Sequence, residues 1–199
     1  YYLALENGFT PSTTFLDEPT TFKLEDNTTY SPSNYNNKYA YKDITLAQAI
    51  AVSDNIFAVK THLFLGTDNL ASLIKKFDIK NVKSNASLAL GTVNTNIYNL
   101  ANMYNTLASE GIYNHVYTIE KITNNEGDIL YQHKAEDKQM LNQDTCLELS
   151  QLLTATFDST YSTYLQATMA AYQLDNINAC KTGSTDFDNL AVAYNPNIL

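Results

Sequence analysis

The chain has 199 residues, a formal net charge of −9 and an isoelectric point of about 4.6. Hydrophobic residues make up 44% and charged residues 17%, a balance typical of a globular chain of one domain rather than a disordered one. The acidic balance argues against a nucleic-acid partner, because no basic patch offsets the repulsion by phosphate. No apolar run reaches the roughly 18 residues that cross a membrane.

The cysteines and histidines show no pattern that predicts chemistry. Cys146 and Cys180 are too few for a disulfide framework, and neither has a His or Cys at metal-ligand spacing. We expect both to be buried thiols. His62, His115 and His133 are scattered along the chain, so the sequence predicts no metal site.

The hydrophobic periodicity predicts many helices and a few late strands. Residues 1–6 are typical of the last turns of a helix ended by Asn7 and Gly8, and a long ordered loop with short extended pieces is expected over 10–41. Helices are predicted over residues 44–52 with a Thr45 cap, 56–65 ended by Gly66, 68–77, 97–109, 145–157 opened by a capping box of Thr145 and Glu148, and 163–172. Strands are predicted over residues 116–123 and 128–132, as a hairpin, and over 179–185 and 189–194, as antiparallel neighbours. The balance predicts an α+β fold that is mostly helical.

The first candidate for chemistry is the run Ser53-Asp54-Asn55, which falls between two predicted helices. A hydroxyl can relay a proton, and a carboxamide two residues later can hydrogen-bond a peptide group. The alternative is a simple helix cap, because Ser, Asp and Asn are the residues that helix N-termini prefer. The run alone does not separate the two interpretations.

The second candidate is the run Lys181-Thr182-Gly183-Ser184-Thr185 on a predicted strand. An ammonium and hydroxyls can bind an anion, and Gly183 lets a ligand backbone approach the strand closely. Such a strand suits an extended peptide whose carbonyl develops negative charge. The alternative is a strand end with a solvated lysine.

Together, Ser-Asp-Asn followed by Lys-Thr-Gly resembles the motif pair of the penicillin-recognising serine acyltransferases. The resemblance is strongest to the transpeptidase domain of class A penicillin-binding proteins and runs from Tyr1 to Pro196. The other segments that carry the resemblance are 32–39, 44–60, Ala89-Leu90-Gly91, 107–111 and 193–196. It implies a β-lactamase/transpeptidase-like fold, with a helical subdomain and an antiparallel sheet.

The sequence departs from the family pattern in two ways. Leu190 stands where the family usually has Trp, and Ala193 where it usually has Gly, which we interpret as packing changes. No Ser-x-x-Lys nucleophile motif stands at the family's position, in the helix that ends in residues 1–8, and it is expected just before Tyr1. The C-terminal helix of the family is also absent, so we expect residues 1–199 to be a transpeptidase-domain fragment, incomplete at both ends and inactive alone.

The resemblance implies catalytic roles for Ser53, Asn55 and Lys181. Ser53 would pass a proton to the leaving amine, and Asn55 would hydrogen-bond the substrate's peptide group. Lys181 would supply positive potential beside Ser53. No direct chemistry is expected from Asp54.

The resemblance also implies that Thr182, Gly183, Ser184 and Thr185 bind the substrate or a β-lactam. Thr182 and Ser184 would hold the terminal carboxylate, and the Ser184 N–H would be one oxyanion donor. Neither a cofactor nor a metal is implied.

The activity that the resemblance implies is a serine DD-transpeptidase. Its substrates would be a peptidoglycan stem peptide ending in D-Ala-D-Ala and an acceptor strand, and β-lactam antibiotics would acylate it. An upstream glycosyltransferase domain and an N-terminal anchor would belong to the whole protein. We expect it at the outer face of the cytoplasmic membrane of a Gram-positive bacterium.

Two other kinds of function stay open. A carboxypeptidase or β-lactamase on the same fold would pass the acyl group to water. A β-lactam sensor or peptidoglycan-binding module would recognise the ligand without catalysis. Deacylation rates would separate the enzymes, and a missing nucleophile in the whole protein would favour binding.

Overall fold

The computed structural model describes residues 1–134, 137–172 and 174–195. The helices are α1 (Tyr2–Glu6), α2 (Leu46–Val52), α3 (Asn55–Leu65), α4 (Thr67–Lys75), α5 (Ile97–Ala108) and α6 (Gln143–Thr154), with 3-10 turns η1 (Tyr35–Asn37), η2 (Ala86–Leu90), η3 (Ala155–Phe157) and η4 (Ser159–Tyr161). The strands are β1 (Thr14–Asp17), β2 (Phe22–Lys23), β3 (Thr29–Tyr30), β4 (Lys42–Thr45), β5 (Ile112–Tyr113), β6 (Lys121–Thr123), β7 (Ile129–Gln132), β8 (Lys138–Gln139), β9 (Ala179–Ser184) and β10 (Asn189–Tyr194). These elements confirm an α+β fold.

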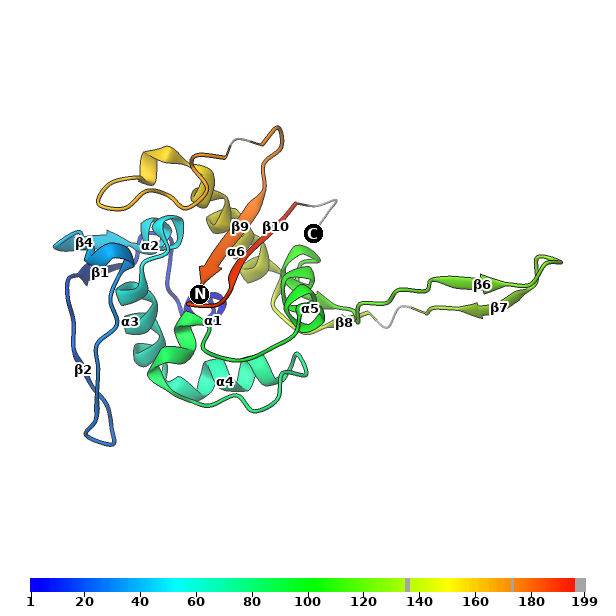
Figure 1. Cartoon of the computed structure of the whole chain (residues 1–199), viewed down its shortest axis with the longest axis horizontal. Coiled ribbons are helices and arrows are strands. Elements are labelled where there is room, and N and C mark those ends of the chain that lie inside the picture. Colours follow the sequence, from blue (N-terminus) through cyan, green and yellow to red (C-terminus); the bar gives the residue numbers. More distant parts are fainter. Residues whose placement is uncertain (135–136, 173, 196–199) are drawn as a thin grey trace.

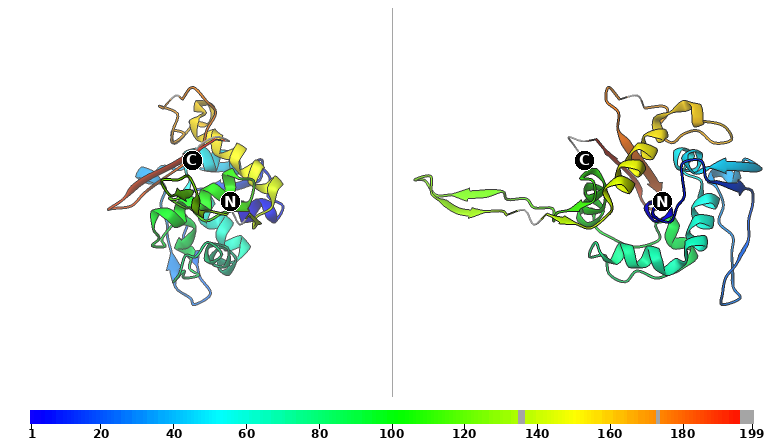
Figure 2. Two further views of the ribbon diagram at one scale, coloured as in Figure 1. Left: turned by 90° about the vertical axis from the view of Figure 1, so that its right-hand side faces the viewer. Right: turned by 180° about the vertical axis from the view of Figure 1, so that it is seen from behind.

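The strands form antiparallel pairs rather than one broad sheet. In the described residues the pairs are β1 with β4, β2 with β3, β5 with β8, β6 with β7, and β9 with β10. The longest pair, β9–β10, lies across α6, while β6–β7 projects far from the body (Figure 1). The view from behind in Figure 2 shows the same projecting arm.

The main core joins the beginning, middle and end of the chain. Apolar side chains of α2, α6 and the β9–β10 ribbon pack together in it, with Leu46, Ile50, Phe57, Leu153 and Tyr194 among its buried members. A second cluster packs α4 and the segment after it against Cys146 of α6. Since α2 and β9 share one core, the segment after α2 is fixed relative to β9.

Most predicted elements are confirmed, with boundaries shifted by a few residues. Thr45 caps α2 as predicted, because its side chain accepts a hydrogen bond from the Gln48 N–H. The predicted hairpin is present as β6–β7, although residues 116–120 of its first strand lie outside β6. As expected, β9 pairs with β10 in the antiparallel sense. Cys146 and Cys180 are free, buried thiols, as predicted.

Two predictions about the helices are wrong. Asn142, not Thr145, caps α6, and the helix begins at Gln143. Residues 163–172 form bends and turns instead of the predicted helix. There, the N–H groups of Thr168 and Met169 donate to Ala51 and Thr156 on other segments. These two N–H groups are therefore not available for the backbone hydrogen bonds of a helix.

The apolar side of α5 is only half-buried. Tyr104, Leu107 and Ala108 of α5 pack against the main core, and Met103 packs against the second cluster. No helix in the described residues is both long and apolar enough to span a membrane.

Candidate active site

Ser53 occupies a strained position between α2 and α3. Its backbone has φ 58° and ψ 54°, the left-handed region, which costs a non-glycine residue about 1 kcal/mol. The Asp54 N–H donates to Ala49 O at 2.9 Å and closes the end of α2. Asp54 then caps α3 by accepting from the Phe57 N–H at 2.7 Å. The run therefore caps a helix, as the alternative interpretation held, and also presents the Ser53 hydroxyl.

Lys181 on β9 brings the two sequence motifs together. Its Nζ donates to Ser53 Oγ at 2.7 Å and to its neighbour Thr182 O at 2.8 Å. Burial lowers the pKa of Lys181 to about 8, and Cys180 beside it raises the pKa slightly. The ammonium is thus near its titration point at neutral to mildly alkaline pH.

Asn55 is the first residue of α3 and is fixed to the segment before η1. Its Nδ2 donates to Ser33 O at 2.7 Å, which orients the amide. Its amide oxygen has no hydrogen-bond partner in the parts of the chain that the structure describes, so this oxygen is the group that Asn55 offers to a ligand.

The β9 strand offers one unpaired edge among the described residues, because β10 is its sole neighbour there. An extended peptide can pair with such an edge through its backbone. Thr182 and Ser184 alternate with Gly183, so their hydroxyls share one face of the strand. A Cβ added at Gly183 would meet nothing within 4 Å, so the space beside it is open.

Thr185 lies apart from this arrangement. Its hydroxyl accepts from the N–H groups of Phe187 and Asp188, at 3.2 and 2.9 Å, and thereby holds the turn between β9 and β10. The hydroxyl hydrogen alone is left for a ligand.

A buried polar cluster behind Ser53 is absent from the sequence predictions. Asp54 accepts hydrogen bonds at Oδ2 from Asn34 Nδ2 at 2.5 Å and from the Tyr164 hydroxyl at 2.7 Å. Asn34 also donates to Asp17, at 2.9 Å. Burial raises the pKa of Asp17 to about 6 and also raises that of Asp54. The sole sequence signal was that Asn34 lies in the segment 32–39, which carries family resemblance.

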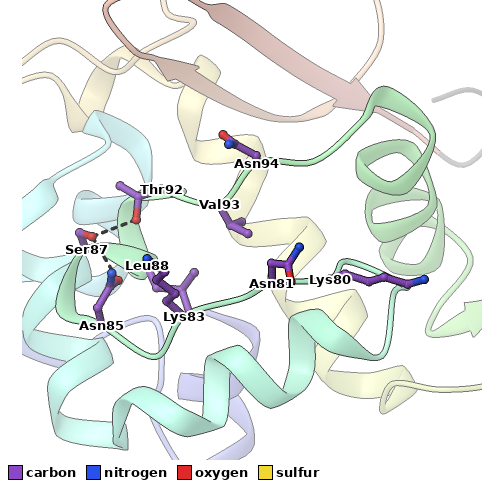
Figure 3. A pocket seen from close by; sticks show the side chains of 9 residues that line it. All are labelled: Lys80, Asn81, Lys83, Asn85, Ser87, Leu88, Thr92, Val93 and Asn94. Carbon is purple, nitrogen blue, oxygen red and sulfur yellow. Dashed lines mark hydrogen bonds between the residues drawn. The ribbon is translucent and has the colours of Figure 1, made fainter.

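A cavity of about 430 Å³ lies elsewhere, between the segment that follows α4 and η2 (Figure 3). Its lining comprises Lys80, Asn81, Lys83, Asn85, Ser87, Leu88, Thr92, Val93 and Asn94. Ser87 links Asn85 and Thr92 along one wall, at 3.1 and 2.9 Å. None of the predicted site residues lines it. Within the described residues, no cluster of three His, Cys, Asp or Glu could hold a metal ion.

Comparison with known proteins places this geometry in a family. Residues 1–197 match the sequence model of the penicillin binding protein transpeptidase domain. Penicillin-binding protein 2D of Bacillus subtilis is 39% identical over 202 residues, which cover all of this chain and 29% of that protein. The chain thus spans less than a third of that relative's length.

Solved structures confirm the fold. The crystal structure of penicillin-binding protein 1A from Haemophilus influenzae superposes with a TM-score of 0.82 at 20% identity, covering 94% of this chain and 33% of that one. Penicillin-binding protein A of Mycobacterium tuberculosis, solved as an imipenem acyl-enzyme complex, gives a TM-score of 0.77 at 16% identity over 98% of this chain and 49% of that one. The chain therefore belongs to the transpeptidase-domain family of the penicillin-binding proteins.

Proposed function

We propose that this domain works as a serine DD-transpeptidase that cross-links peptidoglycan stem peptides and is acylated by β-lactams. The observation that carries the proposal is the hydrogen bond from Lys181 Nζ to Ser53 Oγ, which joins the two motifs beside the open edge of β9. Family membership supports the reaction class. A serine in a Ser-x-x-Lys motif, outside residues 1–199, would be the nucleophile.

The direction of that hydrogen bond supports the role that we propose for Ser53. Because the Ser53 oxygen accepts from the Lys181 ammonium, its own hydrogen is free to point elsewhere. In the transition state Ser53 would donate this proton to the leaving D-Ala amine while it takes up, through the site, the proton that the nucleophilic serine gives up on attack. In deacylation the proton of the acceptor amine would return to that serine by the reverse route. Lys181 would keep the serine oriented and stabilise negative charge nearby.

The β9 strand would hold the donor peptide. Its free edge would pair with the extended stem peptide, and the hydroxyls of Thr182 and Ser184 would bind the terminal carboxylate. The Ser184 N–H would be one oxyanion donor. The Asn55 amide oxygen would accept from a substrate peptide N–H.

The partners and location are part of the same proposal. The greater length of the relatives supports a larger whole protein. We propose that it works on peptidoglycan at the cell surface, with an anchor and a glycosyltransferase domain upstream. The assignment to a Gram-positive bacterium stays a prediction.

Fluorescent penicillin tests the proposal on the protein in its full natural length. We expect one serine upstream of Tyr1 to be labelled covalently, identified by mass spectrometry of the labelled peptide. Lys181→Ala and Ser53→Ala should each slow labelling by about 100-fold or more. Lys42→Ala, which removes an exposed lysine on β4, is the matched control and should label at the parental rate.

Each alternative function gives a different result. Rapid loss of the label with turnover of the drug would identify a hydrolase in place of a transpeptidase. A folded protein that never labels would leave a binding or sensing role. If Lys181→Ala and Lys42→Ala slow labelling by penicillin to the same extent, the proposed catalytic role of Lys181 is wrong.

A further inference from the structure

The N-terminus of α3 is fixed by side chains from two separate segments. The first N–H groups of a helix have no partner inside the helix and must find one elsewhere. Asn34 Oδ1 accepts from the N–H groups of Asn55 and Ile56, at 2.9 and 3.2 Å. Asp54 accepts from the third, that of Phe57. The backbone immediately after Ser53 is therefore attached to a residue of the distant loop before η1.

Asn34 uses all of its hydrogen-bonding capacity in this cluster. Its side chain is 2% exposed, and Asp17 and Asp54 are each 1% exposed. Its two amide N–H groups donate to Asp17 Oδ1 and Asp54 Oδ2, while its oxygen takes the two backbone groups of α3. Carboxylates on one side and N–H donors on the other allow a single orientation of the amide.

The two carboxylates are themselves held. Asp17 Oδ2 accepts from the Ala40 N–H at 2.6 Å, and Asp54 accepts from the Tyr164 hydroxyl. Tyr164 belongs to the turn segment that also contacts α2, where Gln48 Nε2 donates to Thr163 Oγ1 at 2.8 Å. Asn34 is therefore the centre of a buried network that joins β1, the loop before η1, α3 and the segment after η4.

We propose that Asn34 is a positioning residue for acyl transfer: it fixes the start of α3 and thereby the Ser53 hydroxyl against Lys181. Among the described residues, Lys181 is the one hydrogen-bond partner of the Ser53 side chain, so the position of that side chain depends on its backbone. That backbone is held on one side by α2 and on the other by the attachment of Asn55 to Asn34. A displacement of about 1 Å would break the 2.7 Å contact, and such misplacement can cost roughly 100-fold in rate.

The inference rests on the proposed acyl-transfer function, and its test uses the same full-length protein and fluorescent penicillin. We expect Asn34→Ala to lower the acylation rate constant at least tenfold, measured well below the melting temperature of every variant. The matched control is Asn102→Ala, which removes another buried asparagine whose Oδ1 binds a backbone N–H, that of Val116 on a distant segment. It should melt earlier but acylate within twofold of the parent.

A double-mutant cycle separates positioning from a general loss of structure. If Asn34 acts through Ser53, Asn34→Ala in a Ser53→Ala background should slow the residual acylation less than threefold. The same factor in both backgrounds, or equal rates for Asn34→Ala and Asn102→Ala, would overturn the inference. A parent protein that is not acylated would instead overturn the proposed function.

Tyr164→Phe keeps the inference testable if Asn34→Ala does not fold. It removes only the hydroxyl that donates to Asp54. We expect acylation to slow several-fold, while Tyr98→Phe, at an exposed position on α5, leaves the rate unchanged. Equal rates for these two variants would contradict the positioning role.

Discussion

At the scale of single residues, the titration of Lys181 links the structure to pH dependence. Burial lowers its pKa to about 8, so the ammonium that holds Ser53 is present below that pH and lost above it. We therefore predict that acylation by penicillin falls as the pH rises through about 8. The measurement is the second-order acylation rate constant as a function of pH, which reports ionisations of the free enzyme.

Lys181→Arg is the control for this prediction. Arginine stays charged throughout the range, so the fall near pH 8 should disappear, even if the different shape of the side chain lowers the plateau. A fall of the same size in Lys181→Arg would assign the titration to another group.

The same shift has a consequence for stability. Between pH 8 and 10.5, the unfolded chain holds a proton on Lys181 that the folded chain has released. The free energy of unfolding should therefore rise with pH in this window relative to Lys181→Met, by up to about 3 kcal/mol. Below pH 8 both states carry the proton, and this difference is constant.

The three residues to which we assign catalysis were predictable from the sequence, but the buried cluster beside them was not. Ser53, Asn55 and Lys181 were found because their motifs match a known family pattern. Asp17 gave no such signal. In the sequence it is a single aspartate in a polar loop, and nothing there shows whether its carboxylate is solvated or buried. Only the fold, which places β1 beside Asn34, shows that it is buried. No direct chemistry is predicted for Asp54, which caps α3 and accepts from Asn34 and Tyr164 in the buried cluster.

At the scale of elements, the cap of α6 shows why the start of a helix is hard to predict. The Thr145-x-x-Glu148 pattern fits a capping box, but Asn142 stands three residues earlier and accepts from the Thr145 N–H at 3.1 Å. The Thr145 hydroxyl instead binds the carboxylate of Glu6. The two cap patterns overlap in the sequence. Asn142 is the cap in the structure, and the Thr145 hydroxyl is engaged by Glu6 of α1 instead.

This assignment predicts a difference between two substitutions. Asn142→Ala should lower the free energy of unfolding by about 1 kcal/mol, because it removes the cap of α6. Glu148→Ala should change it by less than about 0.5 kcal/mol, since Glu148 lies within the helix and caps nothing. Denaturant unfolding curves of the two variants measure these changes in the free energy of unfolding. A larger loss for Glu148→Ala than for Asn142→Ala would favour the capping box of Thr145 and Glu148 instead.

Residues 163–172 show the other limit of sequence-based prediction. Leu165 and Ala167 are both buried, although residues two apart do not share a helix face. Their neighbours Thr168 and Met169 donate backbone hydrogen bonds to Ala51 and Thr156 on other segments. The Ala167 N–H donates to Ser162 Oγ at 3.0 Å. The distant partners of Thr168 and Met169 override local preference, and a single sequence does not reveal them.

At the scale of the whole molecule, the body and the β6–β7 arm differ in how they are stabilised. The body has buried clusters that join distant segments, whereas every residue of β6 and β7 is exposed. Ile122, Ile129, Leu130 and Tyr131 of the arm are between 43 and 66% exposed, and none belongs to a buried cluster. A two-stranded hairpin alone is marginally stable in water.

We therefore predict that the arm can be removed without harm to the acylation site. The His133 N–H donates to Glu120 O at 2.8 Å, so an Asn-Gly turn can replace residues 121–132 and close the remaining strands. Because no core contact is lost, the temperature that halves penicillin labelling should shift by less than about 2 °C, with an unchanged acylation rate. The control is Tyr194→Ala at the end of β10, which empties a buried site in the main core and should lower that temperature sharply. A comparable loss on removing the arm would mean that its exposed apolar residues pack against another part of the whole protein.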